Sequence, residues 1–139
     1  MKVDIRITHL SGERLWDYDK PLPSKVNLSI NINLMEITRK DPVSVEAPFM
    51  FTINYSPPVA HISIKGKVFA SGSEDEISSM MDEQQRTKRP PAQLLQAVSS
   101  ACMAEAVLLS RSINIPPPIP PLPPPPTGKE AGPSTSYTR

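Results

Sequence analysis

The chain has 139 residues, 18 of them proline, with a formal net charge of +1 and a single cysteine. A net charge near zero excludes a global electrostatic attraction to nucleic acid or acidic membranes, and the single Cys102 excludes an internal disulfide and a zinc site built from cysteines. Because the alternating, charged N-terminus is no signal peptide and no apolar run reaches the roughly 18 residues that cross a bilayer, we expect a cytoplasmic protein that does not insert into membranes.

The N-terminal part of the chain alternates between apolar and polar residues, which is the period of a half-buried β-strand. Residues 2–8 form the first predicted strand, and a loop that carries Trp16 and Tyr18 follows it. Residues 26–34 form the clearest strand, with apolar side chains at even positions and serine or asparagine at odd positions. We expect a turn at 39–42, because charged residues and a proline end the alternation there.

Two further strands are predicted at 43–55 and 60–70. Pro48 indicates that the third strand lies at an edge of the sheet or contains a bulge, since proline lacks the N–H group that a ladder needs. Gly66 indicates a bulge in the fourth strand. Successive strands joined by short turns predict an antiparallel sheet.

Beyond Gly72 the apolar period changes from two to about 3.6 residues, which predicts two helices. Ser73 is a suitable N-cap for a short helix that reaches Arg86. Pro91 opens a long helix that ends near Asn114 and has an apolar stripe formed by Leu94, Leu95, Val98, Cys102 and Leu109. Strands followed by helices predict an α+β fold, in which a four-stranded antiparallel sheet carries the short and the long helix on one face.

Nine of the eleven residues from Pro116 to Pro126 are proline, which excludes a helix interior or a central strand. We therefore divide the chain into an α+β domain at 1–115, a polyproline segment at 116–126 and a disordered tail at 127–139. Interleaved isoleucine residues indicate that the first part of the polyproline segment packs on the domain. Its all-proline end resembles the ligands of polyproline-reading modules such as WW domains.

The sequence contains no constellation of residues that indicates catalysis, a metal site or a cofactor. Its glycines match neither dinucleotide nor Walker signatures, and His9 and His61 are isolated, whereas metal sites need clustered ligands. Cys102 lies on the apolar stripe of the long helix and is expected in the core, although a pair with either histidine is conceivable. We therefore expect a protein that is not an enzyme and has no cofactor.

Several residues are candidates for binding another protein. Trp16 and Tyr18 either anchor a partner or fasten their loop onto the sheet, and the methionines either accept varied partners or fill the core. The candidate protein-binding residues are Trp16, Tyr18, Met35, Met50, Met80, Met81, Leu122, Pro123, Pro124, Pro125 and Pro126. A second hypothesis is a ribosome- or RNA-associated factor whose basic residues contact phosphates. Its candidates are Arg39, Lys40, Arg86, Lys88, Arg89 and Arg111, together with the tail.

The order of these elements resembles the SecB-like chaperones over residues 3–121. The resemblance is carried by the early strand, the Trp16 loop, the strands 26–34, 43–55 and 59–70, and the helix that ends in Ser110-Arg111-Ser112-Ile113-Asn114-Ile115-Pro116-Pro117. It implies a non-enzymatic holdase that binds unfolded polypeptide in apolar grooves and assembles through sheet faces. The chain departs from the family pattern in its richer proline tract and its lack of an acidic surplus, and both departures argue against a role in export.

The leading hypothesis is therefore a protein-binding module that buries unfolded or extended apolar polypeptide against a surface lined by methionine and aromatic residues. The backbone of the client would pair with an exposed strand edge. We also expect a homo-oligomer that assembles through a sheet face or edge.

Overall fold

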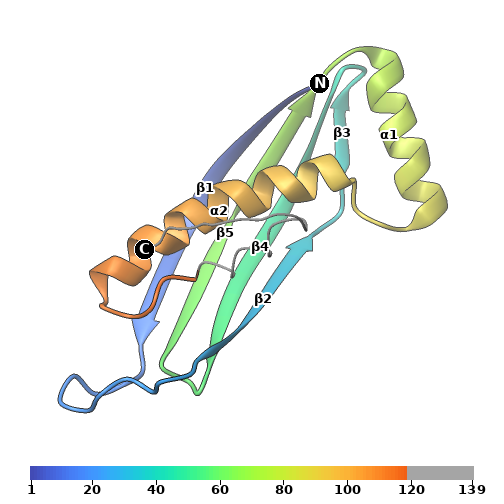
Figure 1. Cartoon of the computed structure of the whole chain (residues 1–139). Coiled ribbons are helices and arrows are strands. Elements are labelled where there is room, and N and C mark those ends of the chain that lie inside the picture. Colours follow the sequence, from blue (N-terminus) through green and yellow to red (C-terminus); the bar gives the residue numbers. More distant parts are fainter. Residues whose placement is uncertain (119–139) are drawn as a thin grey trace, which may run out of the picture.

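The computed structural model describes residues 1–118 and contains one antiparallel sheet and two helices (Figure 1). The elements follow in the order β1 (Lys2–Arg14), β2 (Asn27–Leu34), β3 (Thr38–Asp41), β4 (Ser44–Ser56), β5 (Ala60–Ser71), α1 (Glu74–Thr87) and α2 (Ala92–Ser112). In the sheet, β1, β5, β4 and β2 lie side by side in this order, and β3 also pairs with β4. Strands followed by helices confirm the predicted α+β class.

The described part of the sheet has five strands, so the prediction of four was wrong. The additional strand is β3, which lies in the segment 39–42 that was predicted as a turn. Strand β4 is 13 residues long, and β2 pairs only with the second half of β4. The first half of β4 is therefore free to pair with β3. Thr38 of β3 lies opposite Glu46 of β4 and extends the pairing. All four side chains of β3 are exposed, so no apolar alternation marks it in the sequence.

Pro48 lies in β4, which has neighbours on both sides, and its register with β5 is continuous. The prediction of an edge position or a bulge was therefore wrong. The Pro48 carbonyl oxygen accepts a hydrogen bond from the N–H of Met35 at 2.9 Å. The N–H and C=O of one residue point to the same side of an antiparallel strand. The missing N–H of Pro48 thus faces the gap between β2 and β3, where no ladder bond is lost.

The irregularity predicted at Gly66 belongs to the strand opposite it. Gly66 pairs with Ile7 of β1, and the next pair joins Lys65 to His9, so Thr8 is the extra residue of a β-bulge. The bulge shifts the alternation of β1 by one residue. This shift explains why the sequence pattern predicted a strand that ends soon after residue 8, whereas β1 continues to Arg14.

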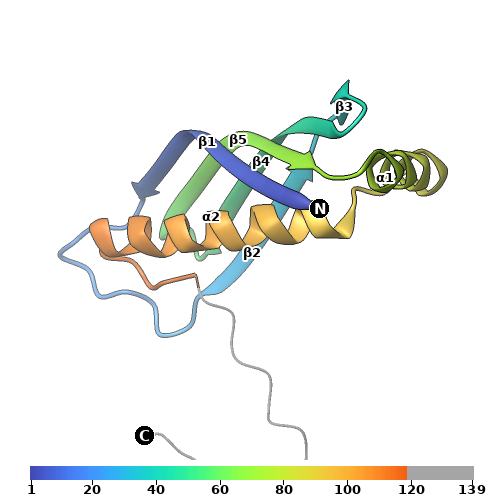
Figure 2. The same ribbon diagram turned by 90° about the horizontal axis from the view of Figure 1, so that it is seen from above.

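The core lies between the sheet and α2, which crosses one face of the sheet (Figure 2). Alternate residues of the two central strands point toward this helix and are almost completely buried: Val45, Ala47, Phe49, Phe51, Ile53, Ile62, Ile64, Val68 and Ala70. The helix contributes Leu94, Val98, Cys102 and Ala106, spaced at four residues, to the same core. Burying a leucine, isoleucine or phenylalanine side chain stabilises a fold by about 1.5–3 kcal/mol.

The short helix α1 lies beyond the end of the sheet, not on its face as predicted (Figures 1 and 2). Ile77 is its one buried residue. The helix begins with a capping box, in which the Ser73 hydroxyl accepts from the N–H of Glu76 at 3.1 Å and the Glu76 carboxylate accepts from the N–H of Ser73 at 2.9 Å. The capping box satisfies N–H groups of the first turn, and Ile77 packs into the core, so both stabilise α1.

The long helix α2 begins after Pro91, close to its predicted start, and ends at Ser112. Asn114 then adopts a left-handed conformation with φ of 53° and reverses the chain. Among helices within residues 1–118, α2 alone is long and apolar enough to cross a membrane by length and composition. Its buried residues pack on the sheet, which is the arrangement of a core helix.

Candidate functional site

Strand β2 forms one edge of the sheet. Its inner side pairs with β4 from Asn27 opposite Ser56 to Leu34 opposite Phe49. Within the described residues, no strand pairs with its outer side. An edge of this kind presents backbone N–H and C=O groups that a further strand can use.

The apolar side chains of β2 lie on the face that carries α2, but the helix covers them incompletely. We call Leu28, Ile30, Ile32 and Leu34 the β2 strip. Ile30 is 38% exposed, whereas its cross-strand neighbour Ile53 is 0% exposed. The difference arises because β2 lies at the edge of the sheet, whereas β4, which carries Ile53, has strands on both sides. The β2 strip is therefore an apolar surface next to a backbone edge that no strand within residues 1–118 pairs with.

The loop between β1 and β2 lies at the beginning of the strip. Trp16 is half-buried against the core, and its indole N–H donates to the carbonyl oxygen of Pro21 at 3.1 Å. Tyr18 is 71% exposed, and its ring lies 4.1 Å from the guanidinium carbon of Arg14. Leu22 is also exposed. Trp16 thus fastens the loop, while Tyr18 and Leu22 face solvent.

The four candidate methionines do not share one surface. Met35 follows the last residue of β2 and is exposed. Met50 lies opposite Asn33, on the sheet face away from α2. Met80 and Met81 are half-buried on α1. Of these candidates, Met35 directly follows the β2 strip, whereas Trp16 and Tyr18 lie just beyond the end of β1, where Arg14 contacts both.

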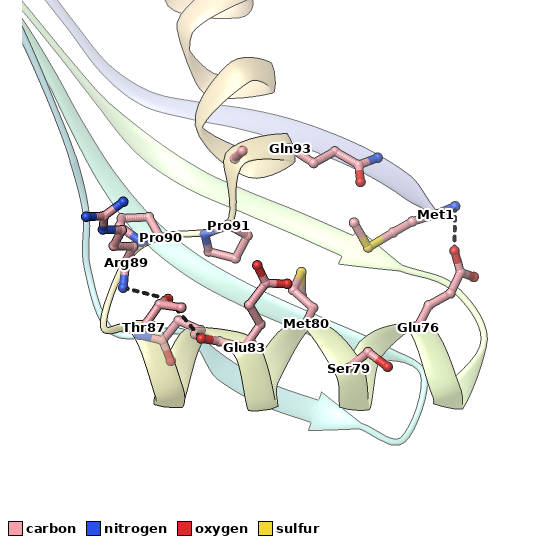
Figure 3. Close-up of a pocket in the computed structure, with 12 residues that line it drawn as sticks. Met1, Glu76, Ser79, Met80, Glu83, Thr87, Arg89, Pro90, Pro91 and Gln93 are labelled. Atoms are coloured by element: carbon pink, nitrogen blue, oxygen red, sulfur yellow. Dashed lines mark hydrogen bonds and ion pairs between the residues drawn. The ribbon is translucent and has the colours of Figure 1, made fainter.

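Met80 borders a cleft of about 580 Å³ between α1 and the start of α2. Figure 3 shows Met1, Met80 and Pro91 around this space, and the Glu83 side chain rises from α1 toward Pro91. The lining has two hydroxyl residues, Ser79 and Thr87, but no histidine, lysine or cysteine that would activate them as nucleophiles. The lining also holds Glu83 and Glu76, and the Glu76 carboxylate pairs with the Met1 ammonium group at 3.3 Å.

The remaining candidates for chemistry are separated from one another. Within residues 1–118, no group of three potential metal ligands occurs. The His61 ring Nδ1 lies 2.7 Å from the Asn54 amide oxygen, on the sheet face away from α2. Cys102 is fully buried, as predicted, and burial, with a smaller effect of Glu105, raises the pKa of its thiol to about 12. A thiol that stays protonated is a poor nucleophile.

The basic candidates of the RNA hypothesis lie in three separate places. Arg39 and Lys40 belong to β3, where Arg39 donates to the Ser78 hydroxyl at 3.1 Å. Lys40 pairs with Glu46 at 2.9 Å, and its hydrogen bond lowers the pKa of that carboxyl group. Three others surround the end of α1, and the last lies near the end of α2: Arg86, Lys88, Arg89 and Arg111. These six residues do not form one common basic surface within the described chain. Binding to RNA therefore stays a prediction.

The other protein-binding candidates, Leu122, Pro123, Pro124, Pro125 and Pro126, lie outside the described residues. The sequence does not distinguish Ile30 from its neighbours, because alternation alone places every even residue of 26–34 in the core. The sequence carries one signal of an edge strand. Asn27, Asn31 and Asn33 occupy the odd positions, and asparagine is unfavourable in the middle of a sheet.

Comparison with known proteins shows a likeness of fold. No protein-family model matches the chain, and no curated protein matches it. One solved structure, a SecB-like chaperone from Mycobacterium tuberculosis in complex with a ChAD peptide from the HigA1 antitoxin, superposes with a TM-score of 0.55 at 12% sequence identity. The match covers 87% of this chain and 89% of that chain. The chain therefore has a fold similar to that of a SecB-like chaperone.

Proposed function

We propose that the domain is a non-enzymatic holdase that binds extended apolar segments of unfolded polypeptides. The observation that carries this proposal is the β2 strip beside a strand edge that has no partner among the described strands, with Ile30 38% exposed next to a fully buried Ile53. Isolated exposed apolar residues are common on protein surfaces. An apolar row along a free backbone edge is less common, because such an edge invites pairing with another chain.

The mechanism follows from the geometry of strand addition. An extended client pairs its backbone with the outer edge of β2, and every second side chain of the client lies on the β2 strip. Backbone hydrogen bonds, each with a net contribution of about 0.5–1.5 kcal/mol, do not depend on the client sequence. Apolar contact then selects segments rich in aliphatic and aromatic residues.

Residues at both ends of the strip extend this surface. Leu22 lies in the loop that leads into β2, and Met35 follows its last residue, whereas Tyr18 stacks on Arg14 of β1 at the opposite edge. Met50 lies on the opposite sheet face and has no part in this mechanism. The SecB-like neighbour is in complex with a peptide, which supports a polypeptide partner.

We also infer a cytoplasmic location and a homo-oligomer. The sheet has a second edge, β1, which pairs only with β5 within residues 1–118. Exposed Leu10 and Leu15 lie at and just beyond its last part. Self-assembly through β1 leaves the edge of β2 accessible to a client. Sedimentation of a Leu10→Lys variant at a lower mass than the native chain would support this arrangement.

The test compares two variants that add the same charge to the same strand. Ile30→Lys places a lysine in the β2 strip, and Asn31→Lys places one on the opposite face. We expect Ile30→Lys to weaken binding of a labelled peptide of alternating valine and threonine by at least about tenfold, which corresponds to 1.4 kcal/mol. Asn31→Lys should bind as the native chain does. Ile30→Lys should also lose the suppression of aggregation of an unfolded client.

Salt separates this function from association with RNA. Apolar and backbone contacts are insensitive to moderate salt, whereas phosphate contacts are lost steeply as salt rises. Binding that is equal in Ile30→Lys and native chains would contradict the proposal, as would a failure of the native chain to suppress aggregation. Circular dichroism checks that both variants are folded.

A further inference from the structure

The sheet face away from α2, which we call the outer face, carries a group of basic residues. No helix of the described chain covers this face (Figure 2). On it, Arg6 of β1 lies opposite Lys67 of β5, and His9 lies opposite Lys65. All four side chains are exposed. Like charges directly opposite each other destabilise a sheet, so the arrangement favours a ligand that supplies negative charge.

The β-bulge at Thr8 creates this grouping. In regular alternation Arg6 and His9, three residues apart, lie on opposite faces of a strand. The extra residue returns His9 to the face of Arg6, where it lies beside Lys65. The Thr8 hydroxyl donates to the carbonyl oxygen of Lys65 at 3.4 Å. Bulges of this kind re-aim side chains and are frequent next to functional sites.

A hollow of about 390 Å³ lies at one end of the outer face and is lined by residues of β1, β3, β4 and β5. Its lining includes Phe69, the one aromatic side chain that the described strands place on this face. Lys2 and Lys40 line it from β1 and β3. The cross-strand pair Ser44 and Ser71 adds two hydroxyl groups. The hollow thus combines an aromatic ring with cations and hydroxyls, in the size range of small-molecule sites.

The acidic residues beside these cations neutralise only part of their charge. Asp4 pairs with Arg6 at 3.0 Å. Glu46 pairs with Lys40 at 2.9 Å and with Lys67 at 3.8 Å. Two further lysines of this face form no ion pair within residues 1–118: Lys2 and Lys65. The outer face of β1 and β5 therefore keeps an excess of positive charge, although the net charge of the whole chain is only +1.

We propose that the outer face binds single-stranded RNA, with one base stacked on Phe69 in the hollow. Stacking on an aromatic ring accepts every base, and cations along the strands hold the phosphates. The guanidinium carbon of Arg6 lies 5.7 Å from the centre of the Phe69 ring. An incoming base displaces this group, which then binds a phosphate. The hydroxyls of Ser44 and Ser71 suit the ribose 2′-hydroxyl, the group that distinguishes RNA from DNA.

This surface is separate from the sites considered above. It shares only Lys40 with the basic residues of the RNA hypothesis. It also lies on the opposite face of the sheet from the β2 strip. RNA and a polypeptide client can therefore bind at the same time, and the inference does not rest on the proposed function.

The first experiment tests stacking. Fluorescence anisotropy measures binding of the full chain to a labelled uridine RNA of about ten nucleotides, a length typical of single-strand binding sites. We expect Phe69→Leu, which keeps an apolar side chain but removes the ring, to bind about tenfold more weakly. Phe69→Tyr keeps the ring and should bind as the native chain does. Equal binding by Phe69→Leu and the native chain overturns the inference, as does a failure of the native chain to bind.

The second experiment tests the phosphate contacts. Lys65→Gln should weaken binding and reduce the dependence of log K on log salt by roughly 0.7, the value for one phosphate of a single strand. Arg111→Gln removes the same charge near the end of α2, on the other side of the sheet. It should leave the salt dependence unchanged. Equal salt dependence in the two variants overturns the inference. Circular dichroism checks that each variant is folded.

Two competitors identify the partner. A deoxyuridine strand of the same length should displace the RNA less well than unlabelled RNA does, because it has no 2′-hydroxyl. Polyglutamate of similar charge has no base to stack and should be weaker still. Equal competition by the deoxyuridine strand overturns the assignment to RNA. Equal competition by polyglutamate also overturns it, because the outer face then binds acidic polypeptides.

Discussion

The guanidinium group of Arg14 donates a hydrogen bond to the carbonyl oxygen of Ile113, 3.2 Å away, and so ties the end of β1 to the residue that follows α2. The same side chain donates to the carbonyl oxygens of Trp16, Asp17 and Asn114, at 2.7, 3.5 and 2.5 Å. One cation thus satisfies carbonyl groups of the β1–β2 loop and of the helix end, which have no partner within their own elements.

This geometry predicts a large effect of removing Arg14. Hydrogen bonds from charged groups contribute about 1.5–3 kcal/mol, so we expect Arg14→Ala to lower the free energy of unfolding by about that amount. Trp16, the single tryptophan, lies in the loop that Arg14 holds. Its emission should shift to longer wavelength when the loop detaches, before global unfolding in a urea titration.

Arg6 supplies the matched control for Arg14. Its side chain is 71% exposed and pairs only with the exposed Asp4 among the described acidic residues. Arg6→Ala should therefore change stability by no more than about 1 kcal/mol. Equal losses of stability in the two variants would show that Arg14 acts only as another surface charge.

Two glycines give opposite predictions. A Cβ atom at Gly66 would collide with the backbone carbonyl oxygen of Arg6 and lie 2.9 Å from the Cα of Ile7. Because backbone of the neighbouring strand must move, we expect Gly66→Ala to cost about 1–3 kcal/mol in chemical denaturation. A Cβ at Gly12 meets Leu109 at 3.6 Å, an ordinary contact. Gly12→Ala should be neutral or stabilise the fold by up to about 1 kcal/mol. A smaller loss at Gly66 than at Gly12 would refute the close approach of β1 and β5.

The sequence pattern predicted the elements whose burial alternates without interruption. The strands 26–34, 43–55 and 60–70 and the long helix are found close to their predicted bounds. Each failure has a local physical cause. The exposed β3 has no apolar period, Thr8 inserts one residue into β1, and Pro48 is tolerated because the strand beside it is broken.

The candidate site was predicted less well, because it depends on where the strands lie in the sheet. Alternation in the sequence shows which side chains share a face, but not which strand is at the edge. Ile30 and Ile53 look alike in the sequence, and only the position of β2 beside β4 leaves Ile30 exposed.

The capping box predicts that α1 is stabilised locally. Ser73→Ala removes the hydroxyl acceptor and should lower helix stability by about 1 kcal/mol, as expected for the loss of an N-cap. Hydrogen exchange of the α1 amides should speed up, while exchange in the buried strands stays unchanged, since α1 does not lie on the sheet. Ser79→Ala, at an exposed position within the same helix, is the control. Equal exchange in both variants would contradict a role for the cap.

Two buried groups predict a loss of stability in alkaline solution. Burial raises the pKa of the Cys102 thiol from 9.0 to about 12 and the pKa of the Tyr55 hydroxyl from 10.0 to about 12. Below pH 9 both groups hold their protons in the folded and the unfolded chain, so their contribution is constant. Above that pH the unfolded chain releases protons that the folded chain retains, and the free energy of unfolding falls.

The slope of this fall distinguishes the two groups. Each contributes at most about 1.4 kcal/mol per pH unit, the thiol from pH 9 upward and the hydroxyl from pH 10. Cys102→Ala should therefore flatten the first part of the curve and Tyr55→Phe the second, whatever each variant costs at neutral pH. Urea titrations between pH 7 and pH 12 measure the free energy of unfolding of each chain. The native chain is measured in parallel, so that the titration of the lysines, which all three chains share, cancels in the comparison. Identical slopes in all three chains would mean that neither group is protected by burial.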